Sequence, residues 1–427
     1  MRHILLKAAS LLAALAPCVS GQPHSQPLTL QDCVRLAESA PSQVSVARQE
    51  REIAARDISQ ARAGFLPQVQ LANGFTYNSP LRSNRETFSF LPLNGIREYA
   101  SLLSVSQEFD TSGRLRADMT RVRAAQEAAA VNLALTQRGL RRAVTTAYYR
   151  ALLTRRLARI TEEALVESQS FEKRTRLLFQ GGEAAQADVV KASAQVAFLQ
   201  QALSAAELEA RIANQELASF WTRDVAATLP LADRLEEPPP APEAEAPQTA
   251  PFLKRPEFNL LDAQRRGFQA DLRRARSGLL PQLGVVFQYG VDSTAVRISD
   301  RGYAAFVNLT IPIFDWNRAR AAMQQARLRT QQVESARAIS ERTFSQEYQS
   351  ALERVKYLFE QISLTRRQAE LAGEDLRLSR IRYEGGEGSA LDVVAAQNGL
   401  AQARSNYYTT MANYLNARAD LEVASGR

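Results

Sequence analysis

Histidine, cysteine and aromatic side chains are scarce in this sequence. Its 427 residues include two histidines and two cysteines, and 7% of them are aromatic. His3 lies near the N-terminus and His24 stands alone, so we expect no Ser, His and Asp triad. No pair of Cys or His residues has the spacing of metal ligands. No glycine-rich phosphate loop follows a strand pattern either. We expect neither an enzyme nor a protein with a bound metal or cofactor.

Long hydrophobic runs are missing near the N-terminus as well. The apolar stretch from Ala8 to Ala16 is too short to cross a bilayer as a helix. Because Arg2 and Lys7 precede it, the stretch is typical of an export signal. We place this signal at residues 1–21 and expect the mature protein to be exported.

Cys18 leaves a second cleavage site open. The sequence Leu15-Ala16-Pro17-Cys18 resembles a lipoprotein signal in which Pro17 disrupts the motif, and cleavage there would leave Cys18 lipidated. Cys33 is the only other cysteine. Neither cleavage leaves two free thiols in one chain, so we expect no intrachain disulfide framework.

The charge balance is modestly basic. The formal net charge of +8 falls to +6 without residues 1–21, because these hold Arg2 and Lys7 and no acidic side chain. Elsewhere arginine is interspersed with glutamate and aspartate along helical segments, which is typical of a solvated helix face. We expect no nucleic-acid partner.

The most informative pattern is an internal repeat. Three landmarks of the first half return in the same order in the second half. They pair Ala63–Gln68 with Ser277–Gln282, Phe109-Asp110 with Phe314-Asp315, and Phe179–Glu183 with Tyr383–Glu387. A proline-rich stretch between the copies forbids regular structure. We divide the chain into a first repeat at 22–235, a linker at 236–251 and a second repeat at 252–427.

Alternation with period two predicts two strands in each repeat. They lie at about 65–78 and 99–109, and at about 281–292 and 303–314. One face of each is apolar and the other polar, as in a transmembrane barrel strand of about ten residues. For one pair alone, a soluble hairpin packed on a helix is the alternative. Because four strands cannot close a barrel, several chains must contribute strands.

Two long helical hairpins complete the repeats, at about 113–220 and 315–422. The stretches are rich in Ala, Leu, Arg, Gln and Glu and carry no proline. A first helix of roughly 65 residues, at about 1.5 Å per residue, is near 100 Å long. Ser112 or Thr111 is expected to cap the first hairpin, and Asp315 the second.

Glycine pairs and one aspartate mark the turn of each hairpin. Each glycine pair is expected to end the long helix, and each aspartate to cap the helix that returns. In the first repeat these residues are Gly181, Gly182 and Asp188. In the second repeat they are Gly385, Gly386 and Asp392.

From about Leu28 to Leu421, this layout resembles the TolC-like outer-membrane efflux family. The resemblance is carried by four features in order. They are the duplicated plan, the strand openings Phe65-Leu66-Pro67-Gln68 and Leu279-Leu280-Pro281-Gln282, the strand exit Ile311-Pro312-Ile313-Phe314-Asp315, and the paired Gly-Gly turns. A somewhat closer likeness to outer components of heavy-metal resistance pumps rests on Gln107–Arg114 and Gly385-Gly386-Glu387.

The resemblance implies a mainly α fold with a small β part. Three chains would close a 12-stranded outer-membrane β-barrel, continued by a periplasmic α-helical barrel. The homotrimer would be a passive channel of a tripartite efflux system. Its partners would be a periplasmic membrane-fusion adaptor, an inner-membrane pump of the resistance-nodulation-division type and outer-membrane lipid. A non-channel coiled-coil adaptor or scaffold of the envelope is the alternative.

The resemblance also assigns roles to the hairpin turns. Both turns would lie at the periplasmic end, where Gly181, Gly182, Asp188, Gly385 and Gly386 would form the surface that docks the adaptor. Asp392 would contribute to an acidic ring that gates the tunnel. The family's second acidic position is Ala395 here, so a double acidic ring is not expected. For Asp392, a capping role alone and a capping role combined with gating both stay open.

Overall fold

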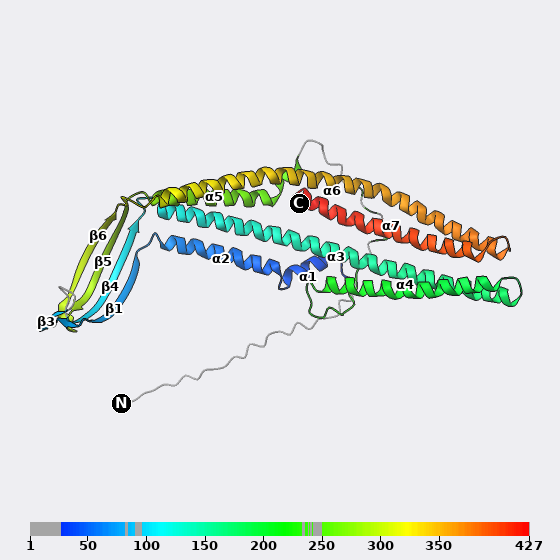
Figure 1. The fold of residues 1–427 in the computed structure, drawn as a ribbon, viewed down its shortest axis with the longest axis horizontal. Helices are drawn as coiled ribbons and strands as arrows, with labels where there is room; N and C mark the ends of the chain where they lie inside the picture. Colours follow the sequence, from blue (N-terminus) through cyan, green and yellow to red (C-terminus); the bar gives the residue numbers. More distant parts are fainter. Residues whose placement is uncertain are drawn as a thin grey trace, which may run out of the picture.

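The computed structural model describes residues 27–81, 84–89, 96–232, 235–237, 239, 241 and 250–426. The expected export signal, with Cys18, lies outside the described residues, as do residues 242–249 of the linker. The molecule is a long rod that carries a sheet at one end and two hairpin turns at the other (Figure 1). The chain passes along this rod twice.

The first half contains four helices and the first two long strands. They are α1 (Leu30–Ser39), α2 (Gln43–Ala63), β1 (Gln68–Tyr77), β4 (Arg97–Phe109), α3 (Arg114–Gln180) and α4 (Gln186–Ala218). A small pair, β2 (Pro80–Leu81) with β3 (Asn84–Ser89), lies between β1 and β4 and was not predicted.

The second half repeats this plan with one helix before the strands. Its elements are η1 (Pro251–Lys254), α5 (Pro256–Ser277), β5 (Gln282–Ser293), η2 (Ile298–Asp300), β6 (Arg301–Thr310), α6 (Arg318–Glu384) and α7 (Ala390–Ala424). The predicted strand at 303–314 extends four residues too far, because β6 ends at Thr310. Pro312 lacks the N–H that a strand ladder needs.

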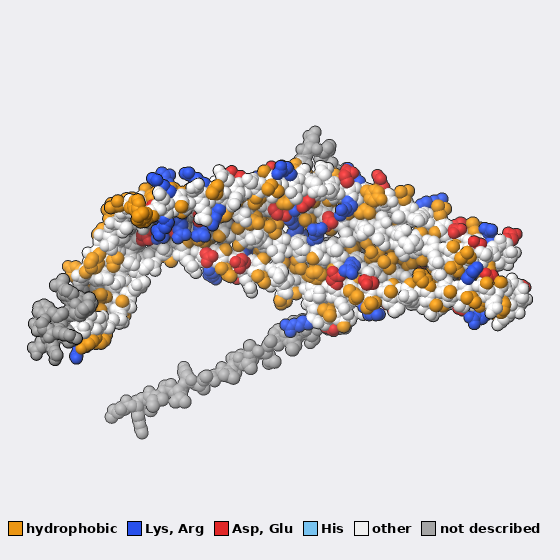
Figure 2. Space-filling model, viewed as in Figure 1, with side chains coloured by type: hydrophobic (Ala, Val, Ile, Leu, Met, Phe, Trp, Pro, Cys, Tyr) orange, Lys and Arg blue, Asp and Glu red, His pale blue; other side chains and the backbone are white. Residues whose placement is uncertain are grey.

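The four long strands form one antiparallel sheet in the order β1-β4-β5-β6. The register aligns the predicted apolar faces across the sheet: Leu71 lies opposite Leu103, Leu103 opposite Tyr289, and Tyr289 opposite Tyr303. The two outer strands are exposed along almost their whole length. Figure 2 shows hydrophobic side chains along the sheet and Lys and Arg gathered where the sheet meets the helices.

The long helices α3 and α6 have 67 residues each. The capping prediction for α3 is wrong, because the carboxylate of Asp110 accepts hydrogen bonds from the N–H groups of Leu115 and Arg116, at 2.9 and 3.2 Å. In α6 the predicted Asp315 carboxylate accepts from the Ala319 N–H at 2.8 Å. Both helices therefore start from the same position of the repeat.

The order of the helices follows from their packing. Helix α3 packs against α2, α4, α5 and α7, α6 packs against α5 and α7, and α4 also contacts α7. Figure 1 shows α2 and α4 along one edge of the molecule and α6 along the opposite edge. Within the described part of the chain, no helix is both long and apolar enough to cross a membrane.

The main hydrophobic core lies at mid-height, where α1, α3, α4, α6 and α7 meet. Tyr148 of α3 and Tyr414 of α7 are fully buried there. The Tyr148 hydroxyl donates a hydrogen bond to the carbonyl of Ala232 at 2.8 Å, and Leu235 is fully buried in the same core. The end of the first repeat, directly before the linker at 236–251, is thus fixed against the rod.

Candidate functional site

Both hairpin turns lie at the end of the rod opposite the sheet (Figure 1). Gly181 and Gly385 are the C-terminal caps of α3 and α6. Gly182 and Gly386 follow with φ angles of +76° and +77°, a left-handed conformation that glycine adopts at little cost. The structure therefore ends both long helices at the predicted glycine pairs, and it brings all four glycines to the same end of the rod.

Asp392 belongs to a capping box at the start of α7. The Ser389 hydroxyl accepts from the Asp392 N–H at 3.2 Å, and Asp392 Oδ2 accepts from the Ser389 N–H at 3.0 Å and from its hydroxyl at 2.9 Å. These hydrogen bonds, the backbone one first, lower the pKa of Asp392 below its ordinary 3.8. The exposed carboxylate is therefore charged at neutral pH.

The first turn lacks this box. Helix α4 begins after Ala185, whose methyl side chain makes no capping hydrogen bond. Asp188 lies in the first turn of α4, where its charge stabilises the positive end of the helix dipole. The sequence predicted a capping role for both aspartates, but of the two only Asp392 belongs to a capping box.

Just above the turns, side chains join the two hairpins. Arg174 of α3 forms an ion pair with Glu384 of α6, and Arg380 of α6 forms an ion pair with Glu167 of α3. The rings of Phe171 and Tyr383 pack between these pairs, with centroids 5.2 Å apart. We name this set the hairpin latch: Glu167, Phe171, Arg174, Thr175, Arg380, Tyr383 and Glu384. Sequence periodicity gave no sign of it, because its two halves are about two hundred residues apart.

A second link joins the returning helices. Gln195 Nε2 of α4 donates to Asn398 Oδ1 of α7 at 2.7 Å. Gln195 is buried, and so is Gln397, the residue that precedes Asn398 in α7. The amide pair ties α4 to α7 at one height above the turns, so the two hairpins are held together by both their descending and their returning helices.

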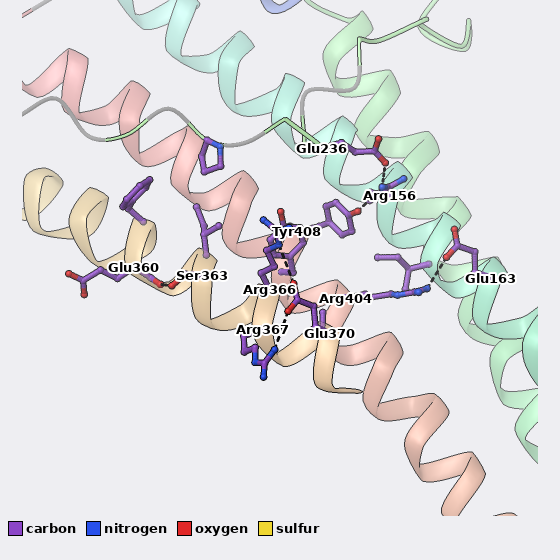
Figure 3. A pocket seen from close by; sticks show the side chains of 16 residues that line it. Arg156, Glu163, Glu236, Glu360, Ser363, Arg366, Arg367, Glu370, Arg404 and Tyr408 are labelled. Atoms are coloured by element: carbon purple, nitrogen blue, oxygen red, sulfur yellow. Dashed lines mark hydrogen bonds and ion pairs between the residues drawn. The ribbon is translucent and has the colours of Figure 1, made fainter. Parts of the chain in front are cut away.

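A cavity of about 1250 Å³ opens further up, between α3, α6, α7 and the linker (Figure 3). Arg156 Nη2 donates to the Tyr408 hydroxyl at 2.6 Å and forms an ion pair with Glu236 of the linker. Arg404 of α7 forms an ion pair with Glu163 of α3 at 3.0 Å. Four arginines and four glutamates line the cavity, so its charges balance. These contacts link α3 of the first hairpin to α7 of the second hairpin and to Glu236 of the linker.

The junction between β6 and α6 exposes a cluster of apolar side chains. Ile313, Phe314 and Trp316 are 95%, 72% and 84% exposed. The Trp316 ring stands edge-on to Phe314 with centroids 4.8 Å apart. Within one chain, Trp316 therefore contacts Phe314 while most of its surface stays exposed.

Comparison with known proteins identifies the architecture. The family model described as outer membrane efflux protein matches residues 34–223 and 253–427, which is most of the chain. The chain belongs to the outer membrane efflux protein family. This family acts at the outer membrane as export channels, not as enzymes.

Curated relatives agree with this assignment. The pyoverdine export outer membrane protein OpmQ of Pseudomonas aeruginosa is 25% identical over 349 residues, which cover 81% of this chain and 73% of that protein. Outer membrane protein OprJ of the same organism is 27% identical over 148 residues, 34% of this chain and 31% of OprJ. The likeness to heavy-metal resistance proteins stays a prediction.

Solved structures show the same fold. The CmeC outer membrane channel of Campylobacter jejuni superposes with a TM-score of 0.83 at 17% identity, covering 93% of this chain and 85% of that one. The outer membrane protein VceC of Vibrio cholerae gives 0.80 at 17% identity, covering 93% and 96%. The predicted fold class, mainly α with a small sheet and duplicated hairpins, is confirmed.

Proposed function

We propose that three copies of this efflux protein form a passive channel across the outer membrane and into the periplasm. Four strands from each copy would close a 12-stranded barrel, and the helices would continue it as a tunnel. Substrates would enter at the hairpin turns and leave through the barrel. The choice of substrate would lie with the pump and the adaptor.

The observation that carries this proposal is the sheet. Its outer strands β1 and β6 have no strand partner beyond β4 and β5 among the described residues. Unpaired strand edges cannot remain in hydrocarbon, because their N–H and C=O groups would have no hydrogen-bond partner. Antiparallel pairing of β6 with β1 of the next copy removes both edges and keeps the apolar face continuous. Trp316 and Phe314 would then lie at the membrane boundary.

The partners follow from the exposed turns. We propose that a periplasmic membrane-fusion adaptor docks on both hairpin turns, around Gly181, Gly182, Asp188, Gly385 and Gly386. An inner-membrane pump of the resistance-nodulation-division type would deliver substrate through it. The turns are the end of the rod farthest from the sheet, which is where such a partner would reach the channel (Figure 1).

We propose Asp392 as the gate residue. Three copies of an exposed carboxylate near the axis of a trimer would give a ring of negative charge. Because its pKa is lowered, the charge persists at neutral pH and is lost only as the pH falls through the lowered value. The ring would attract cations and narrow the resting tunnel.

The test is single-channel conductance in a planar bilayer for the wild type, Asp392→Ala and Asp188→Ala. We expect trimers with small, cation-selective currents, and a larger or less selective current from Asp392→Ala only. Asp188→Ala is the matched control, because Asp188 has the same place in the other hairpin without the capping box. If all three proteins form trimers with the same conductance and selectivity, Asp392 caps its helix and does not gate the tunnel. Absence of both trimer and current would refute the channel.

A further inference from the structure

Arginine side chains gather where the helices meet the sheet (Figure 2). The first twelve residues of α6, from Arg318 to Arg329, hold four arginines and no acidic residue. Six exposed arginines of this region form a set that we name the arginine belt. They are Arg62 of α2, Arg116 and Arg123 of α3, Arg276 of α5, and Arg320 and Arg327 of α6. Charges of one sign gathered on a surface attract a partner of the opposite sign.

The internal repeat places the belt residues in equivalent pairs. One pair lies two residues before the glycine that follows α2 or α5, a second pair is third in α3 or α6, and the last pair is tenth in these helices. The pairs are Arg62 with Arg276, Arg116 with Arg320, and Arg123 with Arg327. The same three basic positions therefore occur twice in each chain.

Contacts at the start of α3 show which way the belt faces. A cavity of about 570 Å³ lies on the polar face of the sheet, where Gln68 and Arg114 line it. Arg114 forms an ion pair there with Glu108, which also lines the cavity. Arg116 and Arg123 follow Arg114 by two and nine residues, so each lies about half a turn round the helix from it. Both therefore point away from the face that the proposed barrel turns to its interior.

The ends of α2 and α5 have the same orientation. Gln60 lines the cavity, so Arg62, two residues later, lies on the opposite side of α2. Arg274 of α5 pairs at 3.0 Å with Asp118, one turn further along the cavity side of α3. Arg276 follows Arg274 by two residues and lies on the opposite side of α5. Since the two belt residues of α6 are equivalent to those of α3, the whole belt faces outward.

Most of the belt is not neutralised within the chain. In the part of the chain that the structure describes, Arg116 is the one belt residue in an ion pair, with Asp110. The nearby Asp118 and Asp271 pair with arginines outside the belt. The other five belt residues therefore keep their charge for a partner outside the chain.

The belt lies directly below the membrane boundary of the proposed channel. Phe314 and Trp316, which mark that boundary, are exposed, and Arg320 lies in the first turn of the helix that follows them. The layer of polar headgroups beside the hydrocarbon core is about 5–8 Å thick, similar to one helical turn. Arg123 and Arg327 lie about 10 Å deeper, which is one Debye length at an ionic strength of about 0.1 M. All six charges can thus act on the headgroups.

We infer that the arginine belt binds the phosphate groups of anionic phospholipids in the periplasmic leaflet of the outer membrane. The inference rests on the proposed channel, because insertion of the sheet brings the belt to the headgroups. Every belt residue is arginine, whose guanidinium donates two parallel hydrogen bonds to a phosphate. In three copies the belt encircles the channel, as the leaflet does, whereas the proposed adaptor docks at the opposite end of the rod (Figure 1).

The test is quenching of Trp316 fluorescence by brominated lipids. The protein is reconstituted in vesicles of phosphatidylglycerol and phosphatidylcholine in equal amounts, with bromine on the acyl chains of one lipid or the other. Trp221, the second tryptophan, packs against the mid-height core and is not at the membrane boundary. We expect quenching that corresponds to a local ratio of phosphatidylglycerol to phosphatidylcholine of at least about three. High salt should lower this ratio.

The triple variant Arg62→Gln/Arg276→Gln/Arg320→Gln removes three belt charges without breaking an ion pair, and it should bring the local ratio to about one. The matched control takes the same charge from exposed arginines of α2 and α6 that lie about 20 Å or more from the belt. It is Arg48→Gln/Arg342→Gln/Arg354→Gln. The control should keep the ratio of the wild type.

The channel and the belt fail in different ways. Brominated phosphatidylcholine alone should quench Trp316 in all three proteins, and its failure to quench the wild type would mean that the sheet is not in the membrane, which overturns both proposals. A wild-type ratio of about one, or a ratio that the triple variant leaves unchanged, overturns the belt and leaves the channel standing. Inorganic phosphate should lower the ratio no more than sodium chloride of the same ionic strength. A stronger loss would assign the arginines to free phosphate and overturn the lipid site.

Discussion

The Tyr383 hydroxyl of α6 donates a hydrogen bond to Thr175 Oγ1 of α3 at 3.4 Å, and both side chains are buried between the two hairpins. The Phe171 ring packs on the Tyr383 ring in the same layer. The hairpins are thus closed against each other by a small apolar core directly above the turns. Whatever separates the hairpins has to break this contact.

Tyr383→Ala should therefore raise the conductance of the isolated channel. Loss of a buried aromatic ring costs about 3–5 kcal/mol, which weakens the contact between the hairpins. Tyr383→Phe is the matched control, because it keeps the ring and removes only a long hydrogen bond, worth about 1 kcal/mol or less. Planar-bilayer recording of both variants checks this. Equal currents from the two variants would show that the ring contact does not hold the resting state.

The ion pairs of the hairpin latch give a separate prediction. Each pair is partly exposed and contributes about 1 kcal/mol or less. Reversal of both arginines, Arg174→Glu with Arg380→Glu, turns two attractions into two repulsions and should increase the current more than either single change. The control is Arg211→Glu, whose ion pair with Glu207 lies within α4. An increase that vanishes in high salt agrees with a screened charge effect. An unchanged current would contradict it.

The repeat in the sequence predicted what is encoded locally. Period-two alternation located the strands, and the Gly-Gly pairs located the turns. The strand predicted at 303–314 is too long because the alternation of side chains continues through Ile311 and Ile313, where the backbone of β6 no longer pairs with β5. Asp110 lies three residues before the N-cap Gly113, so residues directly before the helix do not indicate it as a cap, whereas its counterpart Asp315 in the second repeat does.

The latch and the central core could not be predicted in this way. Tyr383 and Thr175 meet because two long helices fold back to one height, and neither residue differs locally from its neighbours. The same holds for Arg156 and Tyr408. Periodicity predicts which face of a helix is buried, but it does not predict the residue that covers that face. Which residues of two helices lie at the same height along the rod is known only from contacts in the structure, such as the hydrogen bond between Gln195 and Asn398.

The glycines of the turns should differ in their tolerance of alanine. Gly182 and Gly386 have left-handed φ angles with open space around the position of a Cβ, so the cost is backbone strain of about 1–2 kcal/mol. Gly181 and Gly385 have φ angles of −79° and −81° and should accept alanine. Hydrogen exchange at the turns is the measurement. We expect exchange at least about fivefold faster for Gly182→Ala and Gly386→Ala than for the two controls.

Cys33 should be unreactive in the native protein. The thiol is fully buried in the central core, and burial, assisted by the neighbouring Asp32, raises its pKa from 9.0 to about 12. Only the thiolate reacts with maleimide, so at pH 8 the reaction should be roughly a thousandfold slower than that of an ordinary exposed thiol. The neutral thiol favours the folded state up to about pH 9, and this contribution is lost as the pH rises towards 12.

The matched control for this labelling is Gln31→Cys, an exposed position two residues earlier in the same helix. It should react at once, while Cys33 reacts only when denaturant unfolds the core formed by α1, α3 and α7. The labelling midpoint of Cys33 then reports the stability of the mid-height core separately from the turns. Rapid labelling of Cys33 in the native trimer would mean that α1 detaches from the rod without unfolding of the rest.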